Sequence, residues 1–72
     1  MDTSTIVYFW VNGQKYYTLK TITLAELVSY FDYTHALLVL EHNLVVCNQH
    51  SWHKILISNF DQIELVTIVG GG

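Results

Sequence analysis

The chain has 72 residues, which is enough for one small domain and too few for a large buried catalytic cleft. Hydrophobic residues make up 51% of the chain, which excludes a disordered segment because such segments cannot bury enough apolar surface to fold. The formal net charge is -3, with three lysines and no arginine, so the composition does not favour binding to nucleic acid or to an anionic membrane.

The sequence contains one cysteine, Cys47, so a disulfide scaffold is excluded and the single thiol fits a reducing compartment. The first apolar run, IVYFWV, follows no basic segment. It is also much shorter than the roughly 20 apolar residues of a membrane span, so we expect neither a signal peptide nor a transmembrane helix. We therefore expect a soluble protein of the cytoplasm, or of the plastid stroma if a plastid genome encodes it.

The chain begins with a predicted β-hairpin. Residues 5–11 (TIVYFWV) are β-branched and aromatic, which is typical of a strand, and residues 14–19 (QKYYTL) form the returning strand. Asn12 and Gly13 stand between them. Asn-Gly is a strong hairpin signal because a type I′ turn requires positive φ at both central residues.

Residues 21–32 (TITLAELVSYFD) predict the one good helix. Thr23 suits the N-cap, and Glu26 three residues later completes a capping box. We expect the helix to end near Phe31 or Tyr33. Apolar residues at helical spacing give it one apolar stripe, formed by Leu24, Leu27, Val28 and Phe31.

The second half of the chain predicts three more strands. Residues 36–47 (ALLVLEHNLVVC) read as two short strands around a turn at His42-Asn43. Residues 48–58 (NQHSWHKILIS) are irregular, with room for one short helical turn. Residues 59–69 (NFDQIELVTIV) give a turn followed by the last strand.

The predicted order is therefore β-β-α-β-β-β, and no linker or repeat divides it. One helix crossing one face of a mixed sheet of four to five strands is an α+β two-layer fold. This order is that of the ubiquitin-like β-grasp. We expect a β-grasp domain over residues 1–69 and a flexible glycine tail over residues 70–72, because glycine gains nothing from ordering at a chain end.

Three motifs resemble the ThiS family, the small sulfur-carrier proteins of thiamin thiazole synthesis. They are the hairpin turn VNG (11–13), the helix start TLAELV (23–28) and above all the ending DQIELVTIVGGG (61–72). The resemblance spans nearly the whole chain. A terminal Gly-Gly alone is shared by all ubiquitin-like carriers and modifiers, whereas the short length and the IVGGG ending point to ThiS.

The resemblance implies that Gly72 is adenylated by an E1-like activating enzyme, which uses ATP. A sulfur donor protein then provides the sulfur of a thiocarboxylate, which thiazole synthase receives. Gly70 and Gly71 let the tail thread a narrow channel, since they carry no side chain. Such a carrier has no catalytic residue and no bound cofactor. The alternatives are a carrier like the small subunit of molybdopterin synthase, or a protein modifier or interaction module.

Both faces of the predicted sheet carry apolar residues. Strand alternation turns one set toward the helix, namely Val7, Phe9, Val11, Ile63 and Leu65. The other set faces outward, and we interpret it as a partner-binding patch beside the root of the tail, formed by Tyr8, Trp10, Glu64, Val66 and Ile68. The alternative is that these large side chains only cap the sheet.

A third group of residues has types that bind metals. Cys47, His50 and His53 recur at three-residue intervals, with His42 nearby, but a structural zinc site needs four ligands and no second pair follows. We therefore expect no metal, with exposed histidines and a buried Cys47. The acidic side chains are scattered and mostly solvated, and Asp61 is expected to shape the turn before the last strand.

Overall fold

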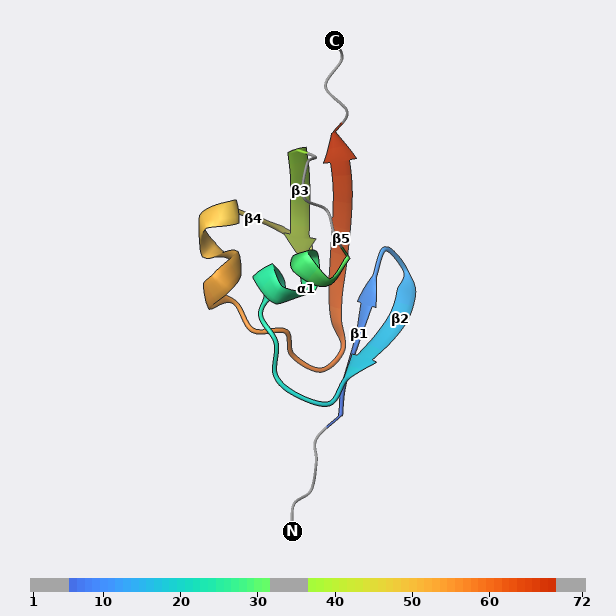
Figure 1. The fold of residues 1–72 in the computed structure, drawn as a ribbon. Coiled ribbons are helices and arrows are strands. Elements are labelled where there is room, and N and C mark those ends of the chain that lie inside the picture. Colours follow the sequence, from blue (N-terminus) through green and yellow to red (C-terminus); the bar gives the residue numbers. More distant parts are fainter. Residues whose placement is uncertain (1–5, 32–36, 69–72) are drawn as a thin grey trace.

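The computed structural model describes residues 6–31 and 37–68, and the remaining segments (1–5, 32–36 and 69–72) lie outside the described part (Figure 1). The predicted boundary between domain and tail falls in the last of these segments. The described residues form five strands, one α-helix and one 3₁₀ helix.

The opening hairpin is confirmed. Strand β1 (Val7–Val11) pairs with β2 (Gln14–Thr18) in antiparallel register. Asn12 and Gly13 form the turn with φ of 51° and 81°, so both central residues have the left-handed conformation of a type I′ turn.

Helix α1 (Leu24–Tyr30) begins with the predicted capping box. The backbone N–H of Glu26 donates to Thr23 Oγ1 at 3.1 Å, and the backbone N–H of Thr23 donates to Glu26 Oε1 at 2.8 Å. Two backbone donors that the helix leaves unpaired are thereby satisfied. The helix ends at Tyr30, with Phe31 as the C-cap, close to the first predicted end.

The second hairpin turns one residue later than predicted. Strand β3 (Leu37–His42) includes His42, and the turn to β4 (Val45–Cys47) is made by Asn43 and Leu44, with φ of 53° and 73°. His42 stays in the strand because it pairs with β5 and its side chain contacts Asp61. Leucine rarely adopts positive φ, so the sequence does not indicate that Leu44 is the second residue of the turn.

The predicted irregular segment contains a 3₁₀ helix, η1 (Gln49–Lys54). Trp52 on this helix is buried, and its Nε1–H donates to the carbonyl of Cys47 at 3.0 Å. The indole joins the helical connection to the core, a role that the sequence pattern did not reveal.

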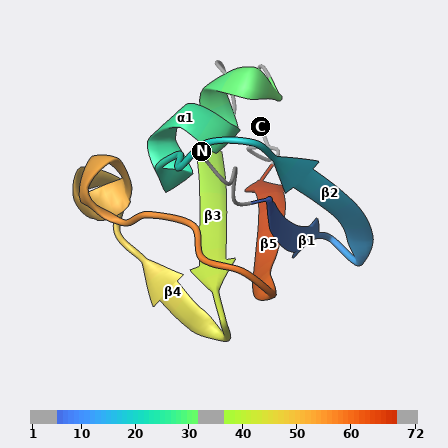
Figure 2. The same ribbon diagram turned by 90° about the horizontal axis from the view of Figure 1, so that it is seen from below.

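The sheet has the order β2-β1-β5-β3-β4, with β5 (Asp61–Ile68) in the middle. Strand β5 runs parallel to β1 and antiparallel to β3, so the sheet is mixed. Helix α1 lies across one face of the sheet (Figures 1 and 2). The architecture confirms the predicted ubiquitin-like β-grasp.

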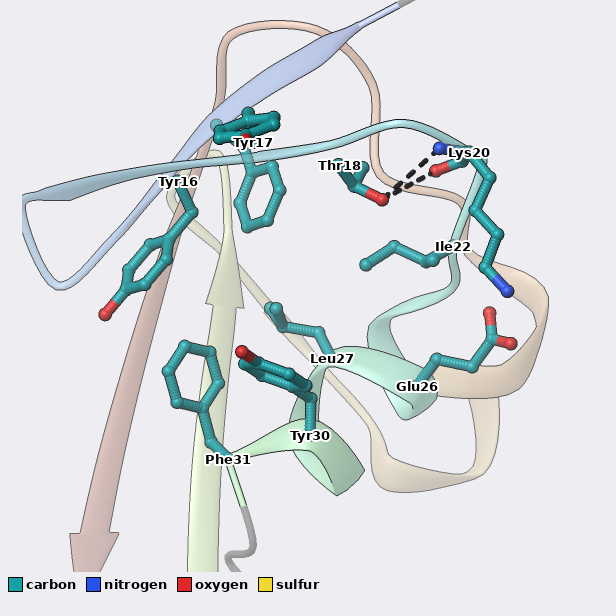
Figure 3. A pocket seen from close by; sticks show the side chains of 10 residues that line it. Tyr16, Tyr17, Thr18, Lys20, Ile22, Glu26, Leu27, Tyr30 and Phe31 are labelled. Carbon is teal, nitrogen blue, oxygen red and sulfur yellow. Dashed lines mark hydrogen bonds between the residues drawn. The ribbon is translucent and has the colours of Figure 1, made fainter.

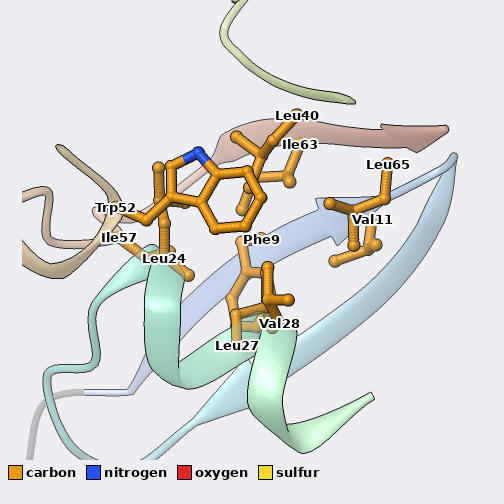
Figure 4. Close-up of a cluster of buried hydrophobic side chains, with 10 residues drawn as sticks. All are labelled: Phe9, Val11, Leu24, Leu27, Val28, Leu40, Trp52, Ile57, Ile63 and Leu65. Atoms are coloured by element: carbon orange, nitrogen blue, oxygen red, sulfur yellow. The ribbon is translucent and has the colours of Figure 1, made fainter. Parts of the chain in front are cut away.

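The core lies between α1 and the sheet (Figure 4). The inward facing predicted for Phe9, Val11, Ile63 and Leu65 is confirmed, since all four are buried. Leu24 from the helix and Leu40 from β3 are fully buried beside them. Burying side chains of this size stabilises the fold by about 1.5–3 kcal/mol each.

Candidate functional site

The predicted reactive tail continues the central strand of the sheet. Gly70, Gly71 and Gly72 lie outside the described residues, so their roles in adenylation and threading stay predictions. Strand β5 ends at Ile68, which pairs with Leu37 of β3. What the structure defines is how the strand leading to the tail is held.

The first hairpin turn is hydrogen-bonded to β5 on the side of β1. The backbone N–H of Asn12 donates to the carbonyl of Ile63 at 2.8 Å. The side-chain amide of Asn12 spans Leu65: Oδ1 accepts from its N–H at 2.7 Å, and Nδ2 donates to its carbonyl at 3.2 Å. These three bonds extend the contact with β5 beyond the end of β1.

The second hairpin turn is hydrogen-bonded to β5 on the side of β3. The backbone N–H of Asn43 donates to the carbonyl of Gln62, and Asn43 Oδ1 accepts from the N–H of Gln62, both at 2.8 Å. Asn43 Nδ2 donates to Asp61 Oδ1 at 3.0 Å. Two turns therefore fix the register of β5, and with it the position from which residues 69–72 continue.

Asp61 is the one buried charged residue in the described ranges, with an exposed fraction of 7%. As predicted, it shapes the turn before β5, because its Oδ2 accepts from the backbone N–H of Ser58 at 2.8 Å. The same oxygen lies 2.6 Å from His42 Nε2. Burial alone would raise the pKa of Asp61, but the hydrogen bonds from Asn43, Ser58 and His42 outweigh burial and hold the pKa below its ordinary value of 3.8.

Aromatic side chains gather on the face of the sheet opposite α1. Tyr8 and Trp10 are half-buried there, and the Tyr8 ring lies 6.2 Å from that of Tyr17. The Trp10 ring lies 6.4 Å from that of Phe60. Lys15 Nζ lies 4.9 Å from the centre of the Tyr8 ring and 6.0 Å from that of Trp10. We call the four rings the aromatic face: Tyr8, Trp10, Tyr17 and Phe60.

The sequence reasoning missed two members of the aromatic face. Tyr17 could have been found, because a two-residue hairpin loop places it directly opposite Tyr8. Phe60 could not, because its position depends on φ of 72° in the turn before β5. Glycine is the residue expected at such a position, so no pattern predicts a phenylalanine there.

The remaining predicted partner-binding residues lie further along β5. Trp10 is level with Gln62 in the β1–β5 register, and Val66 follows Gln62 by about 13 Å at the usual rise of a strand. Glu64 and Val66 are exposed, and Glu64 is directly opposite Glu41 of β3. The side chain of Ile68 lies outside the described part. Trp10 and Val66 are thus separated along β5, because β1 pairs only with the start of that strand. The role of Tyr8, Trp10, Glu64, Val66 and Ile68 in binding a partner stays a prediction.

The candidate metal ligands do not converge. His50 and His53 are exposed on η1, whereas His42 contacts Asp61. Cys47 is half-buried, and its Sγ lies 3.5 Å from the carbonyl oxygen of Val45. Within residues 6–31 and 37–68, no group of three or more His, Cys, Asp or Glu side chains could hold a metal ion. No helix of these residues is long and apolar enough to cross a membrane.

The mixed five-stranded sheet and the helix that crosses it define a ubiquitin-like β-grasp protein. The sequence model of the ThiS family matches residues 9–72, and the chain therefore belongs to the ThiS family.

Two further comparisons found proteins similar to this chain, and the second of them supports the fold. The ycf40 protein of Trieres chinensis is 58% identical over 69 residues, which cover 96% of this chain and 94% of that protein. The ycf40 protein of Porphyra purpurea is 29% identical over 62 residues, which cover 86% and 87% of the two chains. The crystal structure of the thiamine biosynthesis protein ThiS from Geobacter metallireducens matches with a TM-score of 0.75 and 23% identity, covering 92% of this chain and all of that one (100%).

Proposed function

We propose that this protein is a sulfur carrier of thiamin biosynthesis, which delivers sulfur for thiazole formation as a thiocarboxylate on Gly72. The observation that carries the proposal is the family match, which continues through the glycines to residue 72. The β-grasp fold supports it, because the strand leading to those glycines is the central one and is held from both sides.

The chemistry requires activation of the terminal carboxylate. An oxygen must leave before sulfur can take its place, and adenylation makes AMP the leaving group. An E1-like enzyme performs this step with ATP, a sulfur donor protein supplies the sulfur, and thiazole synthase accepts it. We assign no bound cofactor to the carrier itself.

A carrier role also fits the polar groups of the domain. Asp61, the buried carboxylate of the described residues, is committed to hydrogen bonds that shape the β5 turn. General acid-base catalysis needs titratable groups that converge in a cleft, and this carboxylate instead serves the fold. The ycf40 relatives support a location in the plastid stroma.

The decisive experiment is ATP-dependent sulfur loading by the cognate activating enzyme, followed by intact mass measurement. We expect the native chain to gain the mass difference between sulfur and oxygen. Deleting Gly72, or adding one alanine after it, should abolish loading and leave the circular dichroism spectrum unchanged. Loading of the extended chain without trimming would contradict the proposal. Co-purification with thiazole synthase, and not with a molybdopterin synthase subunit, would settle the pathway.

The aromatic face is our proposed docking surface for the activating enzyme. Buried aromatic anchors commonly cost at least about 2 kcal/mol on truncation, so Trp10→Ala should weaken binding at least about tenfold. Only a small loss of stability is expected, because Trp10 faces away from the core cluster. Tyr30→Ala is the matched control, since Tyr30 is an exposed aromatic on the helix side. Equal binding by both variants would show that the face only covers the sheet.

A further inference from the structure

A pocket opens between α1 and the β2 edge of the sheet, where Tyr17 of the aromatic face also lines it. Its volume is about 380 Å³, within the range of about 300–1,000 Å³ typical of ligand pockets. Three aromatic rings gather at one end (Figure 3). The Phe31 ring makes edge-to-face contacts with Tyr16 at 5.3 Å and with Tyr30 at 5.4 Å.

The polar end of the pocket carries a cation. Thr18, Lys20 and Glu26 line it. Glu26 Oε1 already accepts hydrogen bonds from Thr23, whereas no carboxylate of the described residues lies within ion-pair distance of Lys20 Nζ. Lys15, by contrast, lies over the rings of the aromatic face. The pocket therefore offers an apolar aromatic wall and, beside the carboxylate of Glu26, an ammonium group that can still donate to an anionic partner.

Strand β2 adds backbone groups to this pocket. It stands at the end of the sheet order and pairs with β1 alone among the described strands. Every second N–H and C=O of such an edge strand points away from the sheet and can pair with another chain. Tyr16 and Thr18 lie on the pocket side of β2, and both line the pocket. An added strand would thus place alternate side chains over the pocket.

We propose that the β2 edge and this pocket bind an extended acidic segment of a partner protein as an added strand. One aromatic or long aliphatic side chain of the segment enters the aromatic end. An aspartate or glutamate two residues away meets Lys20, since side chains at this spacing share one face and lie about 6.6 Å apart. The charge of Lys20, and an edge of β2 that pairs with no second strand among the described residues, favour a peptide segment over a neutral small molecule.

The proposed site leaves the rest of the protein accessible. Helix α1 lies on one side of the sheet (Figure 2). Of the four rings of the aromatic face, only Tyr17 also lines the pocket, whereas Tyr8, Trp10 and Phe60 do not. A partner bound at β2 can therefore hold the protein while the aromatic face and Gly72 engage a different enzyme. The inference does not depend on the sulfur chemistry, so the two can fail separately.

The experiment is a titration of the ¹⁵N-labelled full chain with the acetylated and amidated peptide STFTDTS, followed by amide chemical shifts. We expect saturable shifts along β2 and α1. Two matched peptides isolate the contributions: STFTKTS reverses the charge, and STFTDTS methylated at alternate backbone nitrogens removes strand pairing. Both should bind more weakly than the parent peptide.

Charge reversal in the protein completes the test. Lys20→Glu should weaken binding of STFTDTS by about fivefold or more and improve binding of STFTKTS, as expected for an exposed charge pair. Lys54→Glu is the control, because it makes the same change on η1, away from the pocket. The proposal is overturned if no saturable shifts appear at millimolar peptide, or if the shifts centre on Trp10 and Phe60 and not on β2 and α1. Equal effects of the two variants, or full binding of the methylated peptide, would also overturn it.

Discussion

The two hairpin turns in the described residues have similar backbone conformations but different residues at the second turn position. Asn12 and Gly13 have φ of 51° and 81°, and Asn43 and Leu44 have φ of 53° and 73°. In each turn the asparagine binds β5 through its backbone N–H and its side-chain amide. The second turn residue is a glycine in one case and a leucine in the other.

The comparison separates two ways of making a tight turn. The first turn uses the residue pair with the lowest backbone cost. In the second, Leu44 is 88% exposed, so no burial offsets its strained φ. The hydrogen bonds of Asn43 to Gln62 and Asp61 hold the turn in place instead. Tertiary contacts can therefore impose a conformation that the local sequence disfavours.

The two turns also differ in their electrostatics. Asn12 binds only the backbone of β5, through Ile63 and Leu65. Asn43 also binds a carboxylate, that of Asp61, which in turn contacts His42. Only the second anchor should therefore respond to pH.

The largest expected effect is the loss of either asparagine. Asn12→Ala or Asn43→Ala should lower the free energy of unfolding by about 2–3 kcal/mol, because hydrogen-bond partners on β5 are left unpaired and alanine is strained at positive φ. Asn12→Gly and Asn43→Gly keep the turn and should cost only about 1–2 kcal/mol. Urea unfolding measures both pairs. A neutral effect at one turn would show that β5 is anchored from one side only.

Sequence reasoning succeeded where a local rule decides the structure. The turn at Asn12, the capping box of Thr23 and Glu26, and the alternation that buries Phe9 follow from neighbouring residues. It failed at Leu44, because that conformation depends on bonds from the second turn to a strand about 20 residues later in the chain.

In the candidate site, too, features set by neighbouring residues could be predicted and features set by distant contacts could not. The role of Gly72 was predicted from the family resemblance alone, and it stays a prediction because Gly72 lies outside the described residues. Tyr8 and Trp10 were placed on the outer face by strand alternation. Their distance from Val66 was not foreseen, because it depends on which residues of β5 pair with β1.

A smaller effect is expected from exchanging the second turn residues. Leu44→Gly should raise the free energy of unfolding by about 0.5–1 kcal/mol, because relief of left-handed strain exceeds the entropy that glycine loses on folding. Gly13→Leu should lower it by a similar amount. A Cβ added at Gly13 meets nothing within 4 Å, so attaching the side chain causes no clash at that atom and the variant mainly reports backbone strain. Leu44→Ala keeps the strain and should be nearly neutral; a stabilising alanine would contradict this interpretation.

The smallest effect is the pH response of the second turn. The pKa of Asp61 is lower in the folded protein than its ordinary value of 3.8, although burial opposes the lowering. The charged carboxylate therefore stabilises the fold fully above pH 3.8, and this stabilisation is lost as pH falls through the folded pKa. Asp61→Asn removes the titrating group. The difference in unfolding free energy between the native chain and this variant should narrow as the pH falls through the folded pKa of Asp61. Amide exchange near Asn43 should accelerate in acid relative to exchange near Asn12, beyond the intrinsic dependence on pH. Equal acceleration at both turns would place the acid-sensitive group elsewhere and leave the two anchors electrostatically alike.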